Sequence, residues 1–421
     1  MLVFKFGGAS VKDADAVRNV AKIIELYTGQ QLIVVISAMG KTTNALETIV
    51  RALRDKDQPL FEETVRTIEE YHLAIAAELF SENNAAISEK IMGIFKSLRD
   101  KSGQPFSSNY DFEYDQIVSL GEVLSTLIVN AYLQSILLPS AWADIRNVIR
   151  TDHQYRDGNV DWDTTEELVK TNILPLFTNA QIIITQGFLG HTPENFTTTL
   201  GREGSDYTAA ILAYCCHADS VTIWKDVPGM LNADPKYFKD TVKLDQISFK
   251  EAIELSYYGA SIIHPKTIKP LQNKSIPLYV KSFQDPEAEG TVIQDDMNKD
   301  GMVPSYIFKV KQVLFSIMPK DFSFIVEKNL SSIFELLAKT GVKINLMQNS
   351  ALSFSFIVDG EKVEISRILK LFQKEYEIKF NDQLELITIR HYDQQTIEKV
   401  TENKKIILEQ RDRQTVRLVV Y

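Results

Sequence analysis

The chain has 421 residues, of which 44% are hydrophobic and 24% are charged, and its formal net charge is -10. This length predicts two or three domains, and the composition is typical of a globular protein, which argues against extensive disorder. The negative charge argues against nucleic acid as a partner, because phosphate backbones favour basic surfaces. A small anionic ligand remains compatible with the sequence, since local groups decide the charge of a pocket.

The chain offers little sign of a disulfide, a leader or a membrane anchor. Its two cysteines, Cys215 and Cys216, are adjacent, so they predict neither a disulfide framework nor a metal site. The first residues, MLVFKFGG, are too short and glycine-rich for a signal peptide. No uncharged apolar stretch is long enough to span a bilayer. We therefore expect a cytoplasmic protein with no membrane partner.

The first elements alternate between strand and helix. Residues 2–6 predict a strand, and Asp13 and Asp15 lie where a helix begins, because the apolar residues that follow recur at helical spacing. Residues 31–37 form a continuous apolar run, as in a strand buried on both faces. This β-α-β order predicts an α/β domain with a mostly parallel sheet between helices.

The remaining elements predict one large α/β domain followed by a smaller C-terminal tail. We expect helices over most of residues 46–98, a loop at 99–109, a strand at 180–190, a helix within 201–216 and a strand entering a loop at 220–229. The first domain is expected to cover residues 1–295. Residues 295–304 are polar, with glycine and proline, and indicate a linker.

The tail, residues 303–421, has the β-α-β-β-α-β order of a ferredoxin-like α+β unit. Strands are predicted at 312–318, 343–348, 353–359, 384–392 and 415–421, and helices at 330–341 and 361–375. One complete unit is expected at about 312–381. The rest predicts a shortened second unit.

Gly7-Gly8 directly after the first strand raises the question of an anion site. Without a Cβ, backbone N–H groups can approach an anion closely, and Lys5 could add a positive charge there. A plain strand-to-helix turn is the alternative. A second candidate, Gly40-Lys41-Thr42, imitates a nucleotide phosphate loop, but Val35 stands where the motif requires glycine.

The stretch TLGREGSDYTAA, residues 199–210, is the stronger candidate. Ser205 and Asp206 could simply cap the helix that follows. Capping does not explain Arg202 or the flanking glycines, whereas an arginine and a helix N-terminus together favour a carboxylate or phosphate. The sequence therefore favours a ligand site at this loop.

For three further features the sequence leaves a structural and a functional interpretation open or favours the structural one. Glu122 lies among apolar residues, so it either pairs structurally or binds a ligand. The loop IWKDVPGMLNADPK, residues 223–236, follows a strand, where open α/β sheets bind ligands. His264 has no obvious catalytic partner and is interpreted as structural.

Taken together, these segments resemble the aspartate kinases of the amino-acid kinase family, over essentially the whole chain. The matching stretches are KFGGAS, SAMGKTTN, SLGE, LGREGSDYTA, IWKDVPGMLNADPK and ELSYYGASIIHP. The tail resembles paired ACT domains, and no homoserine dehydrogenase region follows, so the monofunctional type is expected.

The resemblance implies transfer of the ATP γ-phosphoryl group to the β-carboxylate of L-aspartate, the first step towards lysine, threonine and methionine, with Mg²⁺ carried by ATP. It implies that the catalytic residues are Lys5 and Asp206. The nucleotide would be bound by Lys5, Gly7, Gly8, Ser10, Lys225, Asp226, Lys236 and Ser261. The substrate would be bound by Ser37, Thr43, Glu122, Arg202 and Ser205, and a regulatory effector by Asn345 and Ser350. No residue is implied as a metal ligand.

Some residues depart from the family pattern. Ala9 and Lys225 replace threonines, Glu203 a glycine and Ser261 a lysine, and Leu231 stands where a tyrosine is common. The departures at 203, 225, 231 and 261 concern ATP and aspartate binding more than the reaction type.

Two other functions are weighed against this one. An amino-acid kinase with another acceptor, glutamate or acetylglutamate, is disfavoured by the ACT-like tail and by Glu122. A catalytically inactive amino-acid sensor would be expected to lack Lys5 or Asp206, and both are present. ACT pairing suggests a homodimer or higher homo-oligomer, with lysine or threonine as possible effectors. Asn345 and Ser350 have an ordinary structural interpretation as well.

Overall fold

The computed structural model describes residues 1–81, 85–260 and 263–421. These residues divide into two compact units. Unit 1 comprises residues 1–230, 243–253 and 261–300, and unit 2 comprises residues 231–242, 254–260 and 301–421. Each unit is described by itself below.

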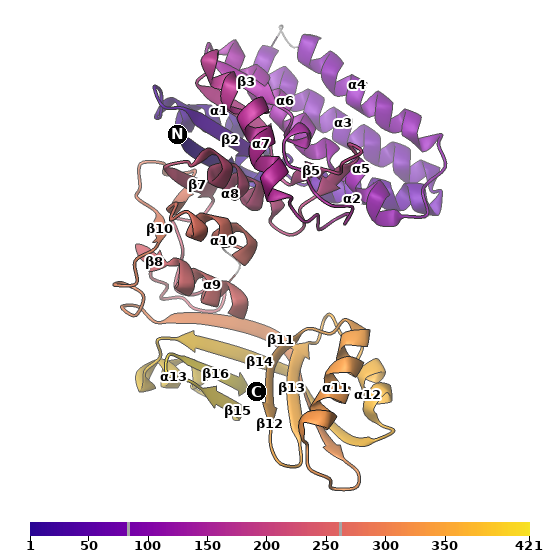
Figure 1. Ribbon diagram of the computed structural model, residues 1–421, viewed down its shortest axis with the longest axis vertical. Coiled ribbons are helices and arrows are strands. Elements are labelled where there is room, and N and C mark those ends of the chain that lie inside the picture. The colour runs from indigo at the N-terminus through magenta and orange to yellow at the C-terminus, as the bar shows by residue number, and fades with distance from the viewer. Residues whose placement is uncertain (82–84, 261–262) are drawn as a thin grey trace. The chain divides into compact units, whose positions relative to one another are not determined.

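Unit 1 is built on a sheet that has eight strands in the described part of the chain, in the order β3-β4-β2-β1-β7-β9-β10-β8 (Figure 1). Its strands are β1 (Leu2–Phe6), β2 (Leu32–Ile36), β3 (Ser140–Ala143), β4 (Ile182–Gln186), β7 (Ser220–Lys225), β8 (Gln246–Ser248), β9 (Leu278–Ser282) and β10 (Thr291–Gln294). A separate small hairpin joins β5 (Leu189–His191) to β6 (Thr197–Thr199). All neighbours in the large sheet are parallel except β9 and β10.

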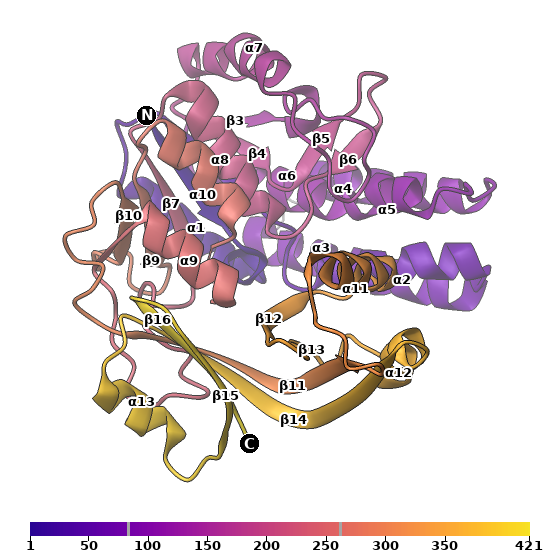
Figure 2. The ribbon, with the colours of Figure 1, turned by 60° about the horizontal axis from the view of Figure 1, so that its bottom comes forward.

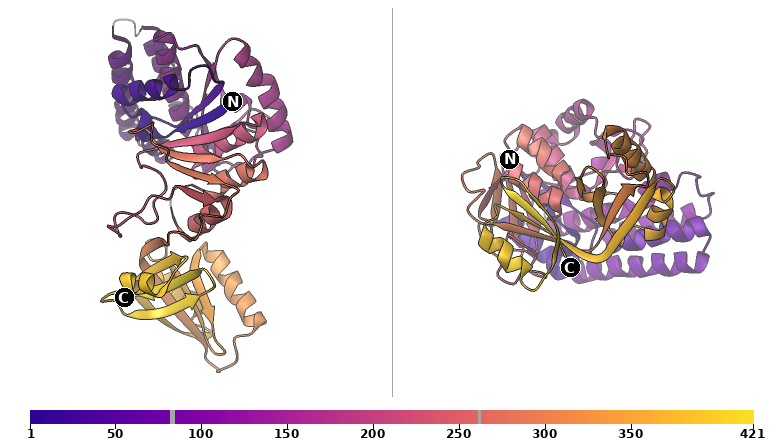
Figure 3. Two further views of the ribbon diagram at one scale, coloured as in Figure 1. Left: turned by 90° about the vertical axis from the view of Figure 1, so that its left-hand side faces the viewer. Right: turned by 90° about the horizontal axis from the view of Figure 1, so that it is seen from below.

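Helices cover both faces of this sheet, as the left panel of Figure 3 shows. They are α1 (Ala14–Glu25), α2 (Thr42–Asp55), α3 (Gln58–Phe80), α4 (Ala85–Ser102), α5 (Tyr110–Val118), α6 (Leu120–Ser135), α7 (Trp162–Asn172), α8 (Gly204–Cys216), α9 (Phe249–Tyr258), which continues into unit 2, and α10 (Pro265–Asn273). Helix α8 packs on β1, β2 and β7, and both α7 and α10 pack on α8. Helix α6 packs on β2, β3 and β4, and α3 packs on α6.

The sheet order places β1 at its centre. From β1 the chain builds outward to β2 on one side and to β7 on the other. In open α/β sheets the carboxyl ends of strands at such a reversal point form the ligand-binding crevice. The carboxyl end of β1 carries Lys5, Gly7 and Gly8.

The longest apolar helical stretch belongs to this core. Residues 110–135 (α5 and α6) are apolar and long enough to cross a membrane by length and composition, but 72% of their most apolar portion is buried. Their side chains pack with Phe4, Val34 and Ile36 of the sheet in one cluster. We interpret the stretch as core.

Unit 2 is built on an antiparallel sheet, six-stranded among the described residues, in the order β12-β13-β11-β14-β16-β15. Its strands are β11 (Ser305–Pro319), β12 (Ile344–Asn349), β13 (Phe354–Asp359), β14 (Tyr376–Arg390), β15 (Ile406–Arg411) and β16 (Thr415–Val420). Its helices are α11 (Glu327–Thr340), α12 (Ile365–Phe372) and α13 (Gln394–Thr401).

Two long strands join the halves of unit 2, as Figure 2 shows. Strands β11 and β14 pair along most of their length, with a register shift between Lys309 and Leu314. At one end β11 pairs with β13, in the half that contains α11 and α12, and at the other end β14 pairs with β16. The first ferredoxin-like half is therefore inserted between the strands that build the second.

Most predicted elements are confirmed, with differences at their ends. Helix α4 runs to Ser102, into the expected loop, because its apolar positions continue to buried Leu98. Strand β11 begins at Ser305, before the predicted 312, and α12 is shorter than predicted. The sequence reading missed α13 and β15, which complete the second half.

Candidate active site

The candidate site is built where β1, β2 and β7 end and where α6 and α8 begin. Lys5 is the fourth residue of β1, and its Nζ lies 2.6 Å from Oδ1 of Asp206 in the first turn of α8. Nζ of Lys225, the last residue of β7, lies 3.7 Å from Oδ2 of the same carboxylate. Asp206 is 2% exposed. A buried carboxylate between two ammonium groups keeps them apart and oriented, so they can face a polyanion.

Glu122 supplies a second buried carboxyl group. It lies in the first turn of α6 and is 3% exposed, and its Oε1 accepts a hydrogen bond of 3.3 Å from the Ala38 backbone N–H. Its Oε2 is buried without a hydrogen-bond partner. Burial raises the Glu122 pKa to about 8, and the Ala38 N–H and the charge of Lys5 oppose that rise. An unpartnered buried carboxyl oxygen of this kind suits a cationic ligand group.

The glycine pair has a structural reason of its own. A Cβ on Gly8 would lie 2.6 Å from the carbonyl oxygen of Ala38, and the Gly40 N–H donates to the Gly8 carbonyl at 3.0 Å. Gly8 therefore lets the loops after β1 and β2 meet. A Cβ on Gly7 would meet only Lys5 Nζ, at 3.6 Å. Ser10, in the short helix Gly8–Val11, is buried with an unpartnered hydroxyl.

Helix α8 begins tightly against the end of β4. A Cβ on Gly187 would lie 2.4 Å from the Ser205 Cβ, so only glycine fits beside this buried serine. Thr208 Oγ1 accepts from the Phe188 N–H at 2.9 Å. Phe188 itself has φ 70°, a left-handed conformation that non-glycine residues adopt at a cost.

Glu203 also lies in the left-handed region, with φ 55° and ψ 29°, directly before α8. This region favours glycine, which explains physically why the family pattern has glycine there. Glu203 is half-buried, and its Oε2 is buried without a hydrogen-bond partner. Its neighbour Arg202 is exposed.

Other predicted residues lie at the edge of this site or outside it. Ser37 follows β2 and donates its N–H to the Phe6 carbonyl, Thr43 is half-buried in the first turn of α2, and Asp226 is exposed after β7. Lys236 and Leu231 belong to unit 2. Ser261 lies outside the described residues.

His264 is the N-cap of α10, where its Nδ1 accepts from the Lys266 N–H at 3.2 Å. That is a structural contact. Burial lowers the His264 pKa, while the nearby Glu203 charge acts to raise it.

The two regulatory candidates have partners within unit 2. Asn345 Oδ1 accepts from Lys309 Nζ at 3.0 Å, and its Nδ2 donates to Gln312 Oε1 at 2.7 Å. Ser350 is exposed in the turn after β12, where its hydroxyl accepts from the Ser353 N–H at 3.1 Å.

Asp115 is a residue that sequence reasoning missed. It is fully buried in α5 and accepts hydrogen bonds from the Thr199 N–H at 2.9 Å, from Thr199 Oγ1 at 2.7 Å and from the Arg156 N–H at 2.9 Å. Thr199 ends β6, three residues before Arg202. Burial raises the Asp115 pKa to about 6, and these hydrogen bonds oppose the rise. The signal available in the sequence was an acid four residues before SLGE.

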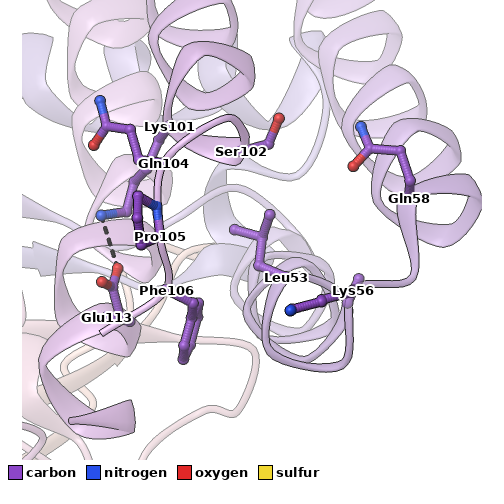
Figure 4. Close-up of a pocket in the computed structure, with 10 residues that line it drawn as sticks. Leu53, Lys56, Gln58, Lys101, Ser102, Gln104, Pro105, Phe106 and Glu113 are labelled. Atoms are coloured by element: carbon purple, nitrogen blue, oxygen red, sulfur yellow. Dashed lines mark ion pairs between the residues drawn. The ribbon is translucent and has the colours of Figure 1, made fainter. Parts of the chain in front are cut away.

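A separate cavity of about 230 Å³ lies between α2, α4 and α5 (Figure 4). Figure 4 shows Lys101 of α4 reaching Glu113 of α5, with Nζ and Oε2 2.7 Å apart. None of the residues that line it was predicted to bind substrate. Among the described residues, no group of three or more His, Cys, Asp or Glu side chains is placed to hold a metal ion.

Comparison with known proteins decides the family. The model of the amino acid kinase family matches residues 1–282. The chain belongs to the amino acid kinase family. Lysine-sensitive aspartokinase 3 of Escherichia coli K12 is 32% identical to it over 360 residues, covering 85% of this chain and 78% of the relative. The resemblance to aspartate kinases is thereby confirmed.

A longer relative and two solved structures agree. A bifunctional aspartokinase/homoserine dehydrogenase of Arabidopsis thaliana is 30% identical over 293 residues, and the match spans 69% of this chain but 32% of that protein. E. coli aspartokinase III in complex with aspartate and ADP superposes with a TM-score of 0.82 and 28% identity, covering all of this chain and 96% of that one. The same enzyme with lysine and aspartate gives a TM-score of 0.83 with the same identity and coverage. The predicted fold class is confirmed.

Proposed function

We propose that this protein is an aspartate kinase, which transfers the γ-phosphoryl group of ATP to the β-carboxylate of L-aspartate and releases 4-phospho-L-aspartate and ADP. The observation that carries the proposal is the Lys5–Asp206 ion pair of 2.6 Å at the carboxyl end of the central strand. Phosphoryl transfer asks the protein mainly for positioning and charge neutralisation, and this pair supplies a fixed cation.

Lys5 stabilises the charge on the transferring phosphoryl group, and Asp206 holds Lys5 in place. Lys225, on the other oxygen of Asp206, adds positive charge towards the nucleotide. Gly7 N–H and the unpartnered Ser10 hydroxyl lie on the same strand-to-helix turn and donate to phosphate oxygens. The carboxylate of aspartate is ionised at neutral pH, so it attacks without a general base.

The acceptor is held by charge on both of its ends. Glu122, buried and with one oxygen unpartnered, receives the ammonium group. Arg202 receives a carboxylate, and Ser37, Thr43 and Ser205 complete the pocket.

ATP is the phosphoryl donor, and it carries Mg²⁺. The two lysines around Asp206 fit the phosphates of a nucleotide. Bound Mg²⁺ neutralises charge on the phosphates. Asp226, Lys236 and Ser261 are proposed on the nucleotide side, as the sequence suggests.

Residues 303–421 are proposed as the regulatory region and residues 1–295 as the catalytic domain. We expect lysine or threonine as a feedback effector, with Asn345 and Ser350 near it, and assembly into a homodimer or higher homo-oligomer in the cytoplasm. The E. coli relative is lysine-sensitive by its name. For this chain both the effector and the assembly are proposals.

The test is acyl phosphate formation. The purified full chain is incubated with Mg·ATP and L-aspartate, L-glutamate or N-acetyl-L-glutamate, and hydroxylamine traps any acyl phosphate as a coloured hydroxamate. Product from aspartate alone is expected. Product from another acceptor would replace the substrate assignment, and none from any acceptor would favour an amino-acid sensor.

A further inference from the structure

Unit 1 contains a second hollow, formed by three of its helices. Helix α8 lies between α7 and α10, which both pack on it (Figures 1 and 2). The hollow has a volume of about 400 Å³ and is lined by side chains of these helices and by residues 158–160 of the loop before α7. This volume lies in the range of small-molecule pockets. None of the residues that line the hollow is assigned to the proposed kinase reaction.

Three aromatic side chains line this α7–α8–α10 hollow. Trp162 of α7 lies edge-on to Tyr207 and Tyr214 of α8, with ring centroids 6.4 Å and 5.0 Å apart. The two tyrosines are seven residues apart, so they lie two turns apart on one face of α8. All three rings are half-buried. A hollow lined by several partly exposed rings favours a ligand that is itself flat and aromatic.

Helix α10 brings positive charge to the hollow. Lys266 and Lys269 lie one turn apart on this helix and both line the hollow, and Lys266 pairs with Asp157. Lys269 is exposed and, in the part of the chain that the structure describes, has no carboxylate within ion-pair distance. A third cation, Lys274 Nζ, lies over the Tyr214 ring, 3.8 Å from its centroid. The hollow therefore combines aromatic rings with an excess of positive charge.

Polar groups beside the rings are available to a ligand. The Tyr207 hydroxyl, the Trp162 indole N–H and the Asn273 amide make no hydrogen bond among the described residues. Burial, with the Asp157 charge next, raises the Tyr207 pKa to about 12, so its hydroxyl stays a donor well above neutral pH. Such groups match the carbonyl oxygens and ring nitrogens at the edge of a heteroaromatic ring.

We propose that the α7–α8–α10 hollow binds a small molecule with a planar aromatic ring that carries an anionic group. The ring packs against Trp162, Tyr207 and Tyr214, and Lys269 binds the anion together with Lys266. The shared chemistry is that of a nucleoside monophosphate or an aromatic carboxylic acid. The site does not depend on the proposed kinase reaction, and its test requires no turnover.

Binding to the full chain is measured by isothermal titration with uridine 5′-monophosphate or benzoate up to about 10 mM, the range of weak metabolite binding. Uridine and benzamide lack the anion, and ribose 5-phosphate lacks the aromatic ring. We expect at least one of the two probes to bind, with its counterparts silent, and Trp162→Leu and Lys269→Met to weaken binding at least ~5-fold each. Lys90→Met, which removes an exposed charge of the same unit, should leave binding unchanged. So should Lys225→Met, which alters the proposed kinase site.

Tryptophan emission shows where the probe binds. The chain has three tryptophans, and of these Trp162 lines the hollow, while Trp142 lies in β3 and Trp224 in β7. Binding should change the emission of the wild type. Trp162→Phe keeps an aromatic ring, so it should still bind the probe in calorimetry but lose the change in emission. An unaltered emission change in Trp162→Phe would place the ligand elsewhere and refute the site.

Three calorimetric results would overturn the proposal: no binding of either probe, equal binding of a probe and its counterparts, or binding that Lys269→Met leaves intact. Binding lost in Lys225→Met would assign the ligand to the proposed kinase site instead. Circular dichroism checks the fold of Trp162→Leu, and the exposed position of Lys269 keeps the test valid if that variant unfolds. A chain with no kinase activity that still binds a probe here would leave this proposal standing and the proposed function refuted.

Discussion

At the scale of single residues, the Lys5–Asp206 pair carries the proposed chemistry. Lys5→Ala removes the cation beside the phosphoryl group, and Asp206→Asn keeps the shape but loses the charge that positions Lys5. Each should lower kcat at least ~100-fold, as loss of a fixed charge-stabilising group does elsewhere. Steady-state kinetics measures this, with circular dichroism to show that the fold is retained. A near-normal kcat for either variant would remove the assigned role.

Glu122 predicts a pH dependence for the acceptor. Its folded pKa of about 8 lies above the ordinary 4.5, so the folded carboxyl group is mostly neutral at pH 7. An ammonium group binds the ionised form, so the KM for aspartate should fall as pH rises from 7 to 8.5 and then level. Glu122→Gln should show a high KM without this slope. The same slope in Glu122→Gln would assign the titration to another group.

The raised pKa of Glu122 also affects the stability of the fold. Raising the pH strengthens aspartate binding but lowers the free energy of unfolding. Between about pH 4.5 and 8 the unfolded chain ionises Glu122 while the folded chain keeps it protonated. The stabilising contribution of Glu122 is therefore greatest below pH 4.5 and is lost as pH rises through 8. Bound aspartate should reverse part of this loss.

Glu203 allows a test of backbone strain at the site. Its φ of 55° costs a side chain about 1 kcal/mol that glycine does not pay. Glu203→Gly should therefore be about 1 kcal/mol more stable than Glu203→Ala, which keeps the left-handed strain but removes the same carboxylate. Urea unfolding of the two variants measures the difference. An alanine variant as stable as the glycine variant would contradict the strain.

At the scale of elements, Asp115 links α5 to the end of β6 and hence to the loop that carries Arg202. Its three accepted hydrogen bonds are buried, so Asp115→Ala leaves the Thr199 and Arg156 donors without partners. We expect a loss of about 2 kcal/mol of stability and a rise in the KM for aspartate larger than that for ATP. Asp115→Asn, which retains an acceptor, should recover part of both. Equal changes in the two KM values would indicate a general structural role.

The elements also show what the sequence could predict. Fully buried β2 follows from its uninterrupted apolar run, and Asp13 caps α1 through the Ala16 N–H as its position predicts. Strand β15 was missed because it is mostly exposed and its three apolar residues stand consecutively before Glu409. Helix α13 was missed because it has only eight residues, with Ile397 and Val400 as its buried apolar positions. An exposed edge strand lacks the alternation on which a strand prediction depends.

The candidate site was predictable only where a local sequence pattern marks a residue. Glycines after β1 and before α8 pointed to Lys5 and Asp206, which form an ion pair in the structure, and a charge among apolar residues pointed to Glu122. Their roles in binding and catalysis stay predictions. Asp115 and Phe188 were not identified, because the partners of a buried acid and the left-handed conformation of a phenylalanine are set by long-range contacts. For Asp115 the sequence offered only its position four residues before SLGE. The sequence suggested that Gly8 is a glycine because an anion approaches its backbone. In the structure the atom nearest to a Cβ at this position is the carbonyl oxygen of Ala38.

At the scale of the whole molecule, the two units are not two consecutive stretches of chain. Residues 231–242 follow β7 and belong to unit 2, where Phe238 stacks on Tyr306 with ring centroids 4.5 Å apart. The Asn232 carbonyl accepts from the Tyr306 N–H at 2.7 Å. The linker composition predicts a single boundary near residue 295. The structure differs, because residues 231–242 and 254–260 lie before that boundary and yet belong to unit 2.

The proposed reaction is defined by the atom that receives the phosphoryl group. The most direct measurement is to incubate the full chain with Mg·ATP and L-aspartate, reduce the acyl phosphate with borohydride and identify the amino alcohol. Phosphorylation of the β-carboxylate predicts homoserine, formed by wild type and lost in Asp206→Asn. Only the isomer derived from the α-carboxylate, or no amino alcohol from an intact fold, would contradict the account.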